Sequence, residues 1–212
     1  MKSVIFPPKC VLCGRILEWE ERDLCAGCRK NAPVFLGRPD AHPHLAKCIC
    51  LWYYKDNVRL GIRMFKFRGR RAYAKGYGRL LAEKLSSLSL EFDVLTWAPV
   101  SLPRLIRRGY DQSALLAKEL GKNLGRKPVR TLYKHRNPPP QTSCNGAAAR
   151  RANVLGAYRC TNPALVRGKR ILLIDDIVTT GSTAGECARV LLTTGAKEVV
   201  LAALASGYHQ QQ

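Results

Sequence analysis

The sequence predicts an α/β fold, in which a mostly parallel sheet is flanked by helices and preceded by a small cysteine-rich module. Two patterns indicate this fold class. Short apolar runs alternate with segments of helical periodicity over most of the chain, and four cysteines form two C-x-x-C pairs near its start. A chain of 212 residues with 46% hydrophobic side chains can bury the core of one moderate domain and still carry an appendage.

The N-terminal module, which we expect to span residues 1–45, contains both cysteine pairs. Cys10 and Cys13 form the first pair, and Cys25 and Cys28 form the second after a spacer of eleven residues. Each pair can direct two thiolates at one ion, and two pairs complete a tetrahedron. The four residues therefore predict a structural Zn²⁺ site with no open position for water. The alternative is a redox pair or a set of free thiols.

In the expected second domain, residues 46–206, apolar runs bounded by turn-forming residues predict buried strands. These runs lie at 48–54, 92–98, 129–133, 171–174 and 198–205. Apolar residues at helical spacing predict the helices between them. The helices lie at 56–67, from the following basic turn to residue 88, at 112–124 and at 184–194. Prolines indicate loops at 99–103 and 137–151, and residues 207–212 are expected to form a flexible tail.

The segment 171–183 carries the clearest chemical signal. Four apolar residues lead into two carboxylates, Asp175 and Asp176, and then into a hydroxyl-rich turn around Gly181. This turn opens a helix, where unpaired backbone N–H groups and the helix dipole favour an anion. Acids at a strand end beside such a turn suit a sugar phosphate, with hydroxyls on the acids and phosphate on the turn. The alternative is an ordinary strand end followed by a capped helix.

These thirteen residues resemble the phosphoribosyl pyrophosphate (PRPP) loop of type I phosphoribosyltransferases. The resemblance implies the type I phosphoribosyltransferase fold. It also implies that Asp175 and Asp176 are catalytic residues that hold the 2′ and 3′ hydroxyls of the ribose. The implied cradle of the 5′-phosphate consists of Thr179, Thr180, Gly181, Ser182 and Thr183.

Several further stretches resemble the ComF (competence protein F) family. They lie at 6–14, 66–69, 97–103, 107–117, 140–142 and 150–154. The resemblance implies a pyrophosphate-binding loop at 99–103, with Val100 and Ser101 in contact with PRPP and with Mg²⁺ bound alongside it. Three arginines, Arg104, Arg107 and Arg108, would reach the pyrophosphate, although solvated surface charge is their alternative role. Residues 134–151 would form a hood that closes over the substrate.

The net charge of +21 far exceeds what one phosphorylated sugar requires. Between Arg59 and Arg79 there are eight Lys or Arg residues and no acid, and aromatic residues are interleaved with them. Such a track suits single-stranded nucleic acid, because phosphates contact the cations and bases stack on the rings. The predicted DNA-binding residues are Arg63, Lys66, Arg68, Arg70 and Arg71. General solubility and an acidic protein partner are the alternatives.

The ComF resemblance implies a role in natural transformation, in which bacteria handle incoming single-stranded DNA alongside a partner helicase. We therefore predict a competence-type protein that handles single-stranded DNA on a PRPP-binding scaffold. The alternative is an active phosphoribosyltransferase that transfers ribose 5-phosphate to an unknown nitrogen acceptor. No apolar run approaches the ~20 residues of a membrane span, and the N-terminus does not fit a signal peptide. A cytoplasmic location without membrane insertion is therefore expected.

Overall fold

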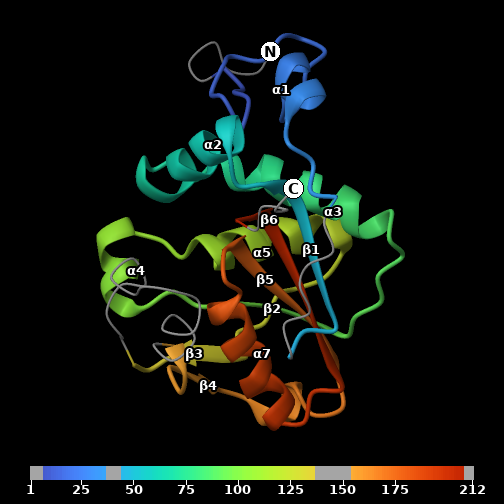
Figure 1. Cartoon of the computed structure of the whole chain (residues 1–212), viewed down its shortest axis with the longest axis vertical. Helices are drawn as coiled ribbons and strands as arrows, with labels where there is room; N and C mark the ends of the chain where they lie inside the picture. Colours follow the sequence, from blue (N-terminus) through green and yellow to red (C-terminus); the bar gives the residue numbers. More distant parts are fainter. Residues whose placement is uncertain (1–6, 37–43, 137–153, 208–212) are drawn as a thin grey trace.

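The computed structural model describes residues 7–36, 44–136 and 154–207. Its centre is a four-stranded parallel sheet (Figure 1), as the alternation of strand and helix patterns predicts. In their order across the sheet, the strands are β1 (Lys47–Tyr53), β6 (Glu198–Ser206), β5 (Arg170–Val178) and β2 (Val94–Trp97). Because β5 lies between β6 and β2, its carboxyl end is flanked by the ends of both neighbouring strands.

Both faces of the sheet are covered, because its central strands are apolar on both sides. On β5, Leu172 and Ile174 join one core while Ile171 and Leu173 join the other, as the two-residue period of a strand requires. The first core is completed by three helices, α2 (Asp56–Phe67), α3 (Tyr73–Ser86) and α5 (Gln112–Leu124). The second core is covered by α7 (Ser182–Thr193) and by a separate antiparallel pair, β3 (Leu132–Lys134) and β4 (Tyr158–Cys160).

The helices predicted at 56–67 and 112–124 are confirmed at both ends. The capping residues of α5 explain its limits. Asp111 accepts a hydrogen bond from the backbone N–H of Ala114 at 3.0 Å, and Gly125 ends the helix in the left-handed conformation. Local capping chemistry therefore makes this helix readable from the sequence.

Several boundaries differ from the prediction, and three of the differences have a clear physical reason. Helix α4 (Leu102–Arg108) begins inside the predicted loop 99–103, since Pro103 suits the first turn of a helix, where no N–H donor is needed. Strand β5 continues through both acids to Val178, because it pairs with β6 as far as Ser206. The strand predicted at 129–133 begins only at Leu132, and its partner β4 has no counterpart among the predicted strands.

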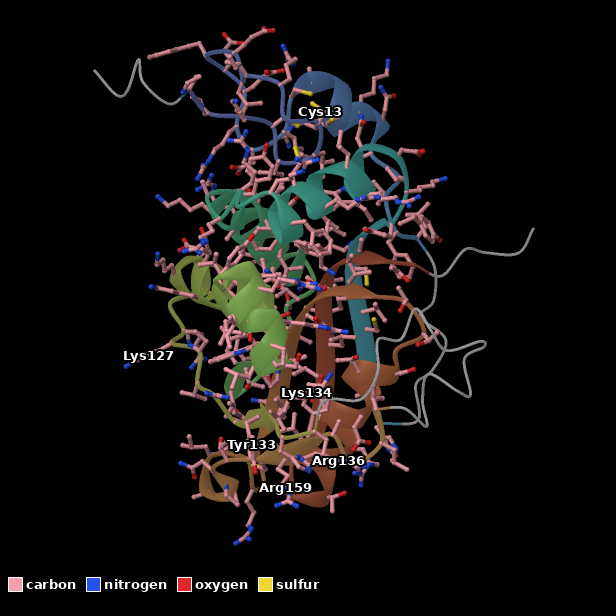
Figure 2. All side chains as sticks on the ribbon, turned by 90° about the vertical axis from the view of Figure 1, so that its left-hand side faces the viewer. Cys13, Lys127, Tyr133, Lys134, Arg136 and Arg159 are labelled. Carbon is pink, nitrogen blue, oxygen red and sulfur yellow. The ribbon has the colours of Figure 1, made fainter. Side chains whose placement is uncertain are left out.

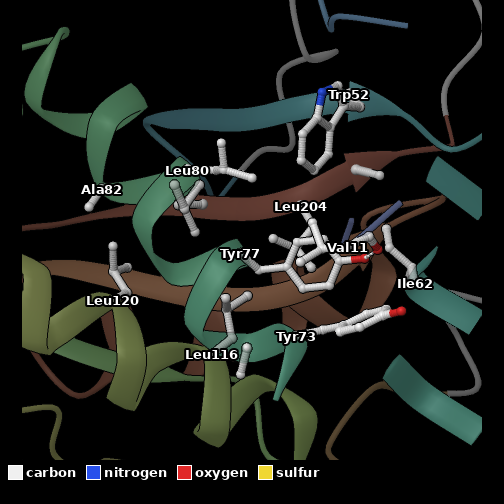
Figure 3. Close-up of a cluster of buried hydrophobic side chains, with 14 of the residues drawn as sticks. Val11, Trp52, Ile62, Tyr73, Tyr77, Leu80, Ala82, Leu116, Leu120 and Leu204 are labelled. Atoms are coloured by element: carbon white, nitrogen blue, oxygen red, sulfur yellow. Dashed lines mark hydrogen bonds between the residues drawn. The ribbon is translucent and has the colours of Figure 1, made fainter. Parts of the chain in front are cut away.

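The cysteine module, defined here as residues 7–36, packs against α2 and α3 and contributes side chains to the first core (Figure 1). Gly61 of α2 permits this close approach, because a Cβ atom there would lie 2.1 Å from the carbonyl oxygen of Val11. The same oxygen accepts a hydrogen bond from the buried Tyr77 hydroxyl at 2.6 Å, and Figure 3 shows the two residues among the apolar side chains. The module and the sheet domain therefore share one hydrophobic core.

The last helical element is a 3-10 turn, η2 (Pro163–Leu165), which precedes β5. Among the helices of the described ranges, none combines the length and the apolar content that crossing a bilayer requires.

Candidate functional site

A cavity of about 310 Å³ opens at the carboxyl end of β5. It lies where β5 meets the loop after β2 and the N-terminus of α7, at the edge where parallel α/β sheets bind their ligands. The cavity is lined by most of the residues that the sequence predicts to contact PRPP. These are Asp175, Asp176, Thr179, Gly181, Ser182, Thr183, Val100, Arg104 and Arg108.

The turn between β5 and α7 forms one wall of the cavity. Gly181 has a φ of 68°, a left-handed conformation that other residues rarely adopt, and it caps the N-terminus of α7. Ser182 and Thr183, in the first turn of α7, line the cavity, and the first N–H groups of a helix have no partner within the helix. Thr180 lies outside the lining, where its hydroxyl hydrogen-bonds that of Ser182 at 2.7 Å. The wall therefore offers N–H and hydroxyl donors to an anion.

The two acids are neighbours in β5 but have different surroundings. Oδ1 of Asp175 accepts hydrogen bonds from the Ser113 hydroxyl at 3.0 Å and from the Asp176 backbone N–H at 2.8 Å. Burial of its carboxyl group, followed by the negative charge of Asp176, raises the pKa of Asp175 to about 7. Asp176 forms an ion pair with Lys66, whose Nζ lies 2.8 Å from Oδ1. Asp175 therefore keeps its proton to a higher pH than an ordinary carboxyl group does, while Asp176 has a cationic partner.

Four cationic side chains line the cavity around these acids. They are Lys66, Arg104, Arg108 and Lys134. Burial lowers the pKa values of Arg108 and Lys134. Arg108 donates a hydrogen bond to Oε1 of Gln112 at 2.7 Å, and its Nε is buried without a partner among the described residues. Arg107, the third predicted arginine, is exposed and does not line the cavity. This cluster of positive charge suits a ligand that carries several phosphate groups.

The loop after β2 forms the opposite wall. Val100 lines the cavity, and its backbone N–H donates to Oδ2 of Asp111 at 3.1 Å. The residue that caps α5 therefore also holds this loop in place. Ser101, predicted to contact PRPP, is buried behind the wall and does not line the cavity. Of the predicted loop contacts, only Val100 is within reach of a ligand here.

Several polar lining residues are absent from the predicted PRPP contacts. They are Tyr54, Lys66, Ser113, Lys134 and Tyr158. Because they come from segments far apart in the sequence, no local pattern connects them with the turn at 171–183. The signals available for two of them were the ComF-like stretches 66–69 and 107–117, which contain Lys66 and Ser113. Lys134 belongs to the predicted hood, of which residues 137–151 lie outside the described residues.

The four-cysteine cluster is a second candidate site. The Sγ atoms of Cys10, Cys13, Cys25 and Cys28 all lie within 4.8 Å of one another, and those of Cys13 and Cys25 are 3.7 Å apart. Zn–S bonds of about 2.3 Å in a tetrahedron separate the sulfur atoms by about 3.8 Å, so the cluster fits zinc. All four positions of the tetrahedron are then filled by protein, as in structural rather than catalytic zinc sites.

Hydrogen bonds to sulfur orient this cluster. Cys25 accepts from the backbone N–H of Cys28 at 3.4 Å and caps α1 (Ala26–Asn31), and Asn57 of α2 donates to the Cys28 sulfur at 3.7 Å. Figure 2 shows the sulfur atoms gathered beside Cys13, at the end of the molecule opposite Tyr133. The cluster therefore stabilises the module and its contact with α2, away from the cavity.

The predicted DNA-binding residues differ in exposure. Arg63, Arg68 and Arg70 are exposed, and no ion pair in the described ranges involves them. Arg71 is exposed as well, but its guanidinium donates to the carbonyl oxygen of Gly109 at 2.9 Å, and Lys66 is turned into the cavity. Three of the five predicted residues are therefore available to a partner.

A groove of about 570 Å³ follows the exposed side of α2. Its lining residues are Asp56, Arg59, Leu60, Arg63, Met64, Phe67 and Arg68. Among the aromatic residues between 59 and 79, Phe67 is 57% exposed, whereas Phe65, Tyr73 and Tyr77 are buried in the core. The Arg108 guanidinium lies 4.9 Å from the centre of the Phe67 ring and covers one face of it. The groove thus combines three arginines with apolar surface and one accessible ring.

The parallel sheet and the cavity at its edge define the class of this protein as phosphoribosyltransferase-like. Residues 111–212 match the phosphoribosyl transferase domain family, and residues 1–40 match the double zinc ribbon domain family. The chain is 31% identical over 217 residues to DNA utilization protein YhgH of Salmonella typhimurium, a match that covers 91% of this chain and 94% of that protein. It therefore belongs to the ComF family, to which YhgH and competence protein F also belong.

The chain is also similar to two further proteins. Competence protein F of Haemophilus influenzae is 26% identical over 205 residues, covering 93% of this chain and 84% of that protein. Among solved structures, glutamine PRPP amidotransferase from B. subtilis is 24% identical, with a TM-score of 0.45. That match covers 63% of this chain and 26% of the amidotransferase.

Proposed function

We propose that this chain is a DNA-handling protein of the competence type, built on a phosphoribosyltransferase domain that binds PRPP together with Mg²⁺. The proposal rests above all on the cavity at the end of β5, where an acid pair, four cations and the N-terminus of α7 converge. A ribose with phosphate groups at both ends matches all three features. We further propose that the protein acts in the cytoplasm, where cysteine thiols remain reduced and available to zinc.

In the proposed complex, each wall of the cavity binds one part of PRPP. The ribose hydroxyls bind Asp175 and Asp176, and the 5′-phosphate binds the turn at 179–183. Because the pKa of Asp175 is about 7, this side chain can accept a hydrogen bond from a ribose hydroxyl or donate one to it. The pyrophosphate lies towards Arg104 and Arg108, and Mg²⁺ would neutralise part of its charge.

We propose that single-stranded DNA binds along the exposed side of α2. The groove there contains Arg59, Arg63 and Arg68, and Phe67 offers one ring face for a base. The net charge of +21 supports an anionic polymer as partner, and so do the names of the relatives, DNA utilization protein and competence protein F. A helicase partner, implied by the ComF resemblance, stays a prediction.

Calorimetric titration of PRPP with Mg²⁺ tests the proposed pocket. The wild type should bind, and the double variant Asp175→Asn with Asp176→Asn should lose binding while keeping its fold and its zinc. Equal affinity of the two proteins would rule out the acid pair as the ribose site. Release of pyrophosphate from PRPP in the presence of a nitrogen acceptor would favour the alternative, an active phosphoribosyltransferase.

Fluorescence anisotropy with a labelled oligothymidylate tests the proposed DNA surface. Replacing the three groove arginines, Arg59, Arg63 and Arg68, with alanine should weaken binding and reduce the slope of log affinity against log salt by about 2, since each phosphate contact contributes about 0.7. The matched control replaces Lys118, Lys127 and Arg159, three exposed cations elsewhere, and removes the same charge. Equal losses in both triple variants would show that net charge, and not the α2 groove, controls binding.

A further inference from the structure

Lys66 lies in the basic segment of α2, yet its side chain does not join the exposed surface. Its ammonium group lies 2.8 Å from Oδ1 of Asp176, and the two side chains are only 15% and 10% exposed. Arg63 and Arg68, on the same segment, are exposed to solvent. Withdrawing a lysine from water costs free energy unless it finds an anionic partner, so the ion pair accounts for its inward orientation.

We propose that Lys66 is a positioning residue of the phosphoribosyl site, which balances the charge of Asp176 and fixes its carboxylate for a ribose hydroxyl. This inference rests on the proposed function of the cavity. A carboxylate can accept about four hydrogen bonds, and the ion pair with Lys66 uses one of them. Asp176 therefore retains acceptor capacity for the hydroxyl groups of a sugar while its orientation is held from α2.

A cation beside Asp176 stabilises the acid pair, because the negative charges of two neighbouring carboxylates repel each other. Burial and then the charge of Asp176 raise the pKa of Asp175, and the charge of Lys66 opposes that increase. The other titratable groups that influence the pair come from several elements. They are Arg108, Tyr110, Asp111, Lys134, Tyr158, Cys50 and Cys187. Among these groups, within the described residues, none forms an ion pair with either acid, whereas Lys66 does.

Helix α2 is itself held on two sides, which gives Lys66 a defined position. Gly61 packs against the backbone of the cysteine module, where a Cβ atom would collide with Val11. The hydroxyl of Tyr110, in the loop between α4 and α5, donates a hydrogen bond to the carbonyl oxygen of Phe65, the residue before Lys66. A side chain that orients a binding group benefits from such a rigid support.

Titrations with three ligands can show whether Lys66 supports binding of the ribose or binding of the phosphates. Calorimetry with ribose 5-phosphate, PRPP and inorganic pyrophosphate, each with Mg²⁺, compares the wild type with Lys66→Met, which keeps the apolar stem and removes the charge. We expect affinity for the two ribose ligands to fall about tenfold, because a buried carboxylate loses its partner, and affinity for pyrophosphate to stay within about twofold. Lys66→Arg should retain most of the affinity, and Lys118→Met, at an exposed position of α5, should change nothing.

A second measurement needs no ligand. Carbon-13 NMR of aspartate carboxyl groups in the free protein should show the Asp175 titration moving to higher pH by about one unit in Lys66→Met, since a nearby cation favours the charged carboxylate. An unchanged titration would overturn the inference, as would equal losses of pyrophosphate and ribose 5-phosphate affinity, which would place Lys66 on the phosphates. If the wild type binds none of the three ligands, the proposed function fails, and the carboxyl titration still decides whether Lys66 controls the acid pair.

Discussion

The cysteine module and the cavity at the end of β5 are constructed in opposite ways. All four cysteines of the cluster lie between residues 10 and 28, whereas the lining of the cavity extends from Tyr54 to Ala184. The module contains five basic and four acidic side chains in a chain whose net charge is +21. The cavity instead gathers four cations around two acids. One site follows from local spacing, and the other exists only after distant segments have packed together.

The two regions also differ in how well their polar groups are satisfied. In the module, Asp23 forms a two-pronged ion pair with Arg79 of α3, with one arm at 2.8 Å. In the cavity, the pKa of Asp175 is raised and that of Lys134 is lowered by burial, and Nε of Arg108 has no partner within the described residues. Buried polar groups without a partner are typical of ligand sites. Changes in the module should therefore reduce stability, and changes in the cavity should mainly reduce binding.

Removal of zinc should have the largest effect. Cys10→Ser, or a strong chelator, should remove about one zinc ion per chain and lower the free energy of unfolding by at least about 5 kcal/mol, since structural zinc supplies folding energy directly. The loss extends beyond the module, because Val11 and Leu12 belong to the core shared with α2 and α3. Metal analysis and thermal unfolding measure both effects. Cys160→Ser in β4 is the control, and a wild type without zinc that is fully folded would contradict the prediction.

The substitution Gly61→Ala should cause the second-largest loss of stability. The added Cβ atom would lie 2.1 Å from the carbonyl oxygen of Val11, a backbone atom that cannot move aside. We expect a loss of about 3 kcal/mol from overpacking, measured by denaturant unfolding. Gly27→Ala is the matched control, because nothing lies within 4 Å of its Cβ position in α1, and it should be neutral or stabilise by up to about 1 kcal/mol. Equal stability of the two variants would show that the module does not depend on this contact.

Asp175→Asn should increase the stability of the protein, because it removes the free-energy cost of burying a charged carboxylate in the cavity. Between an unfolded pKa of about 3.9 and a folded pKa of about 7, the folded protein binds more protons than the unfolded chain. Stability therefore falls as pH rises through that window, and the cost is fully present above pH 7. The variant should melt several degrees higher than the wild type at pH 8, with a difference that shrinks towards pH 5. A lower melting temperature at pH 8 would contradict this account.

The smallest expected effect is a difference in PRPP affinity between variants of two arginines that were both predicted to contact the pyrophosphate. Arg104 lines the cavity, whereas Arg107 is exposed on the same helix. Arg104→Ala should reduce PRPP affinity about tenfold, as the loss of one charge-assisted contact does, and Arg107→Ala should reduce it less than about twofold. Calorimetry with the two single variants makes the comparison directly. Equal losses would mean that long-range charge, and not contact, governs binding.

Most of the fold was predictable because its signals are local. The helices 56–67 and 112–124 were predicted to the residue. Capping residues mark both ends of α5, whereas α2 has no side-chain cap and was identified by its apolar spacing. The antiparallel partner β4 and the extension of β5 to Val178 were not, because strand pairing supplies the hydrogen bonds and no local pattern encodes the partner. In the cavity, the segment 171–183 identified one wall. Ser113 and Lys66 come close to the acids only because tertiary packing brings α5 and α2 to the end of β5.

The sequence by itself determined the chemistry that depends on neighbours in the chain. This includes the four thiolates at zinc-binding spacing, the acid pair at the end of β5 and the glycine turn that opens α7. Tertiary structure decided which cations face those acids and which face solvent. A lysine in a basic segment has the same local sequence signal whether it is buried or exposed, because its environment is set by the elements packed against its helix. Lys66 therefore lies in the cavity, although the pattern of charges around it is typical of a DNA-binding surface.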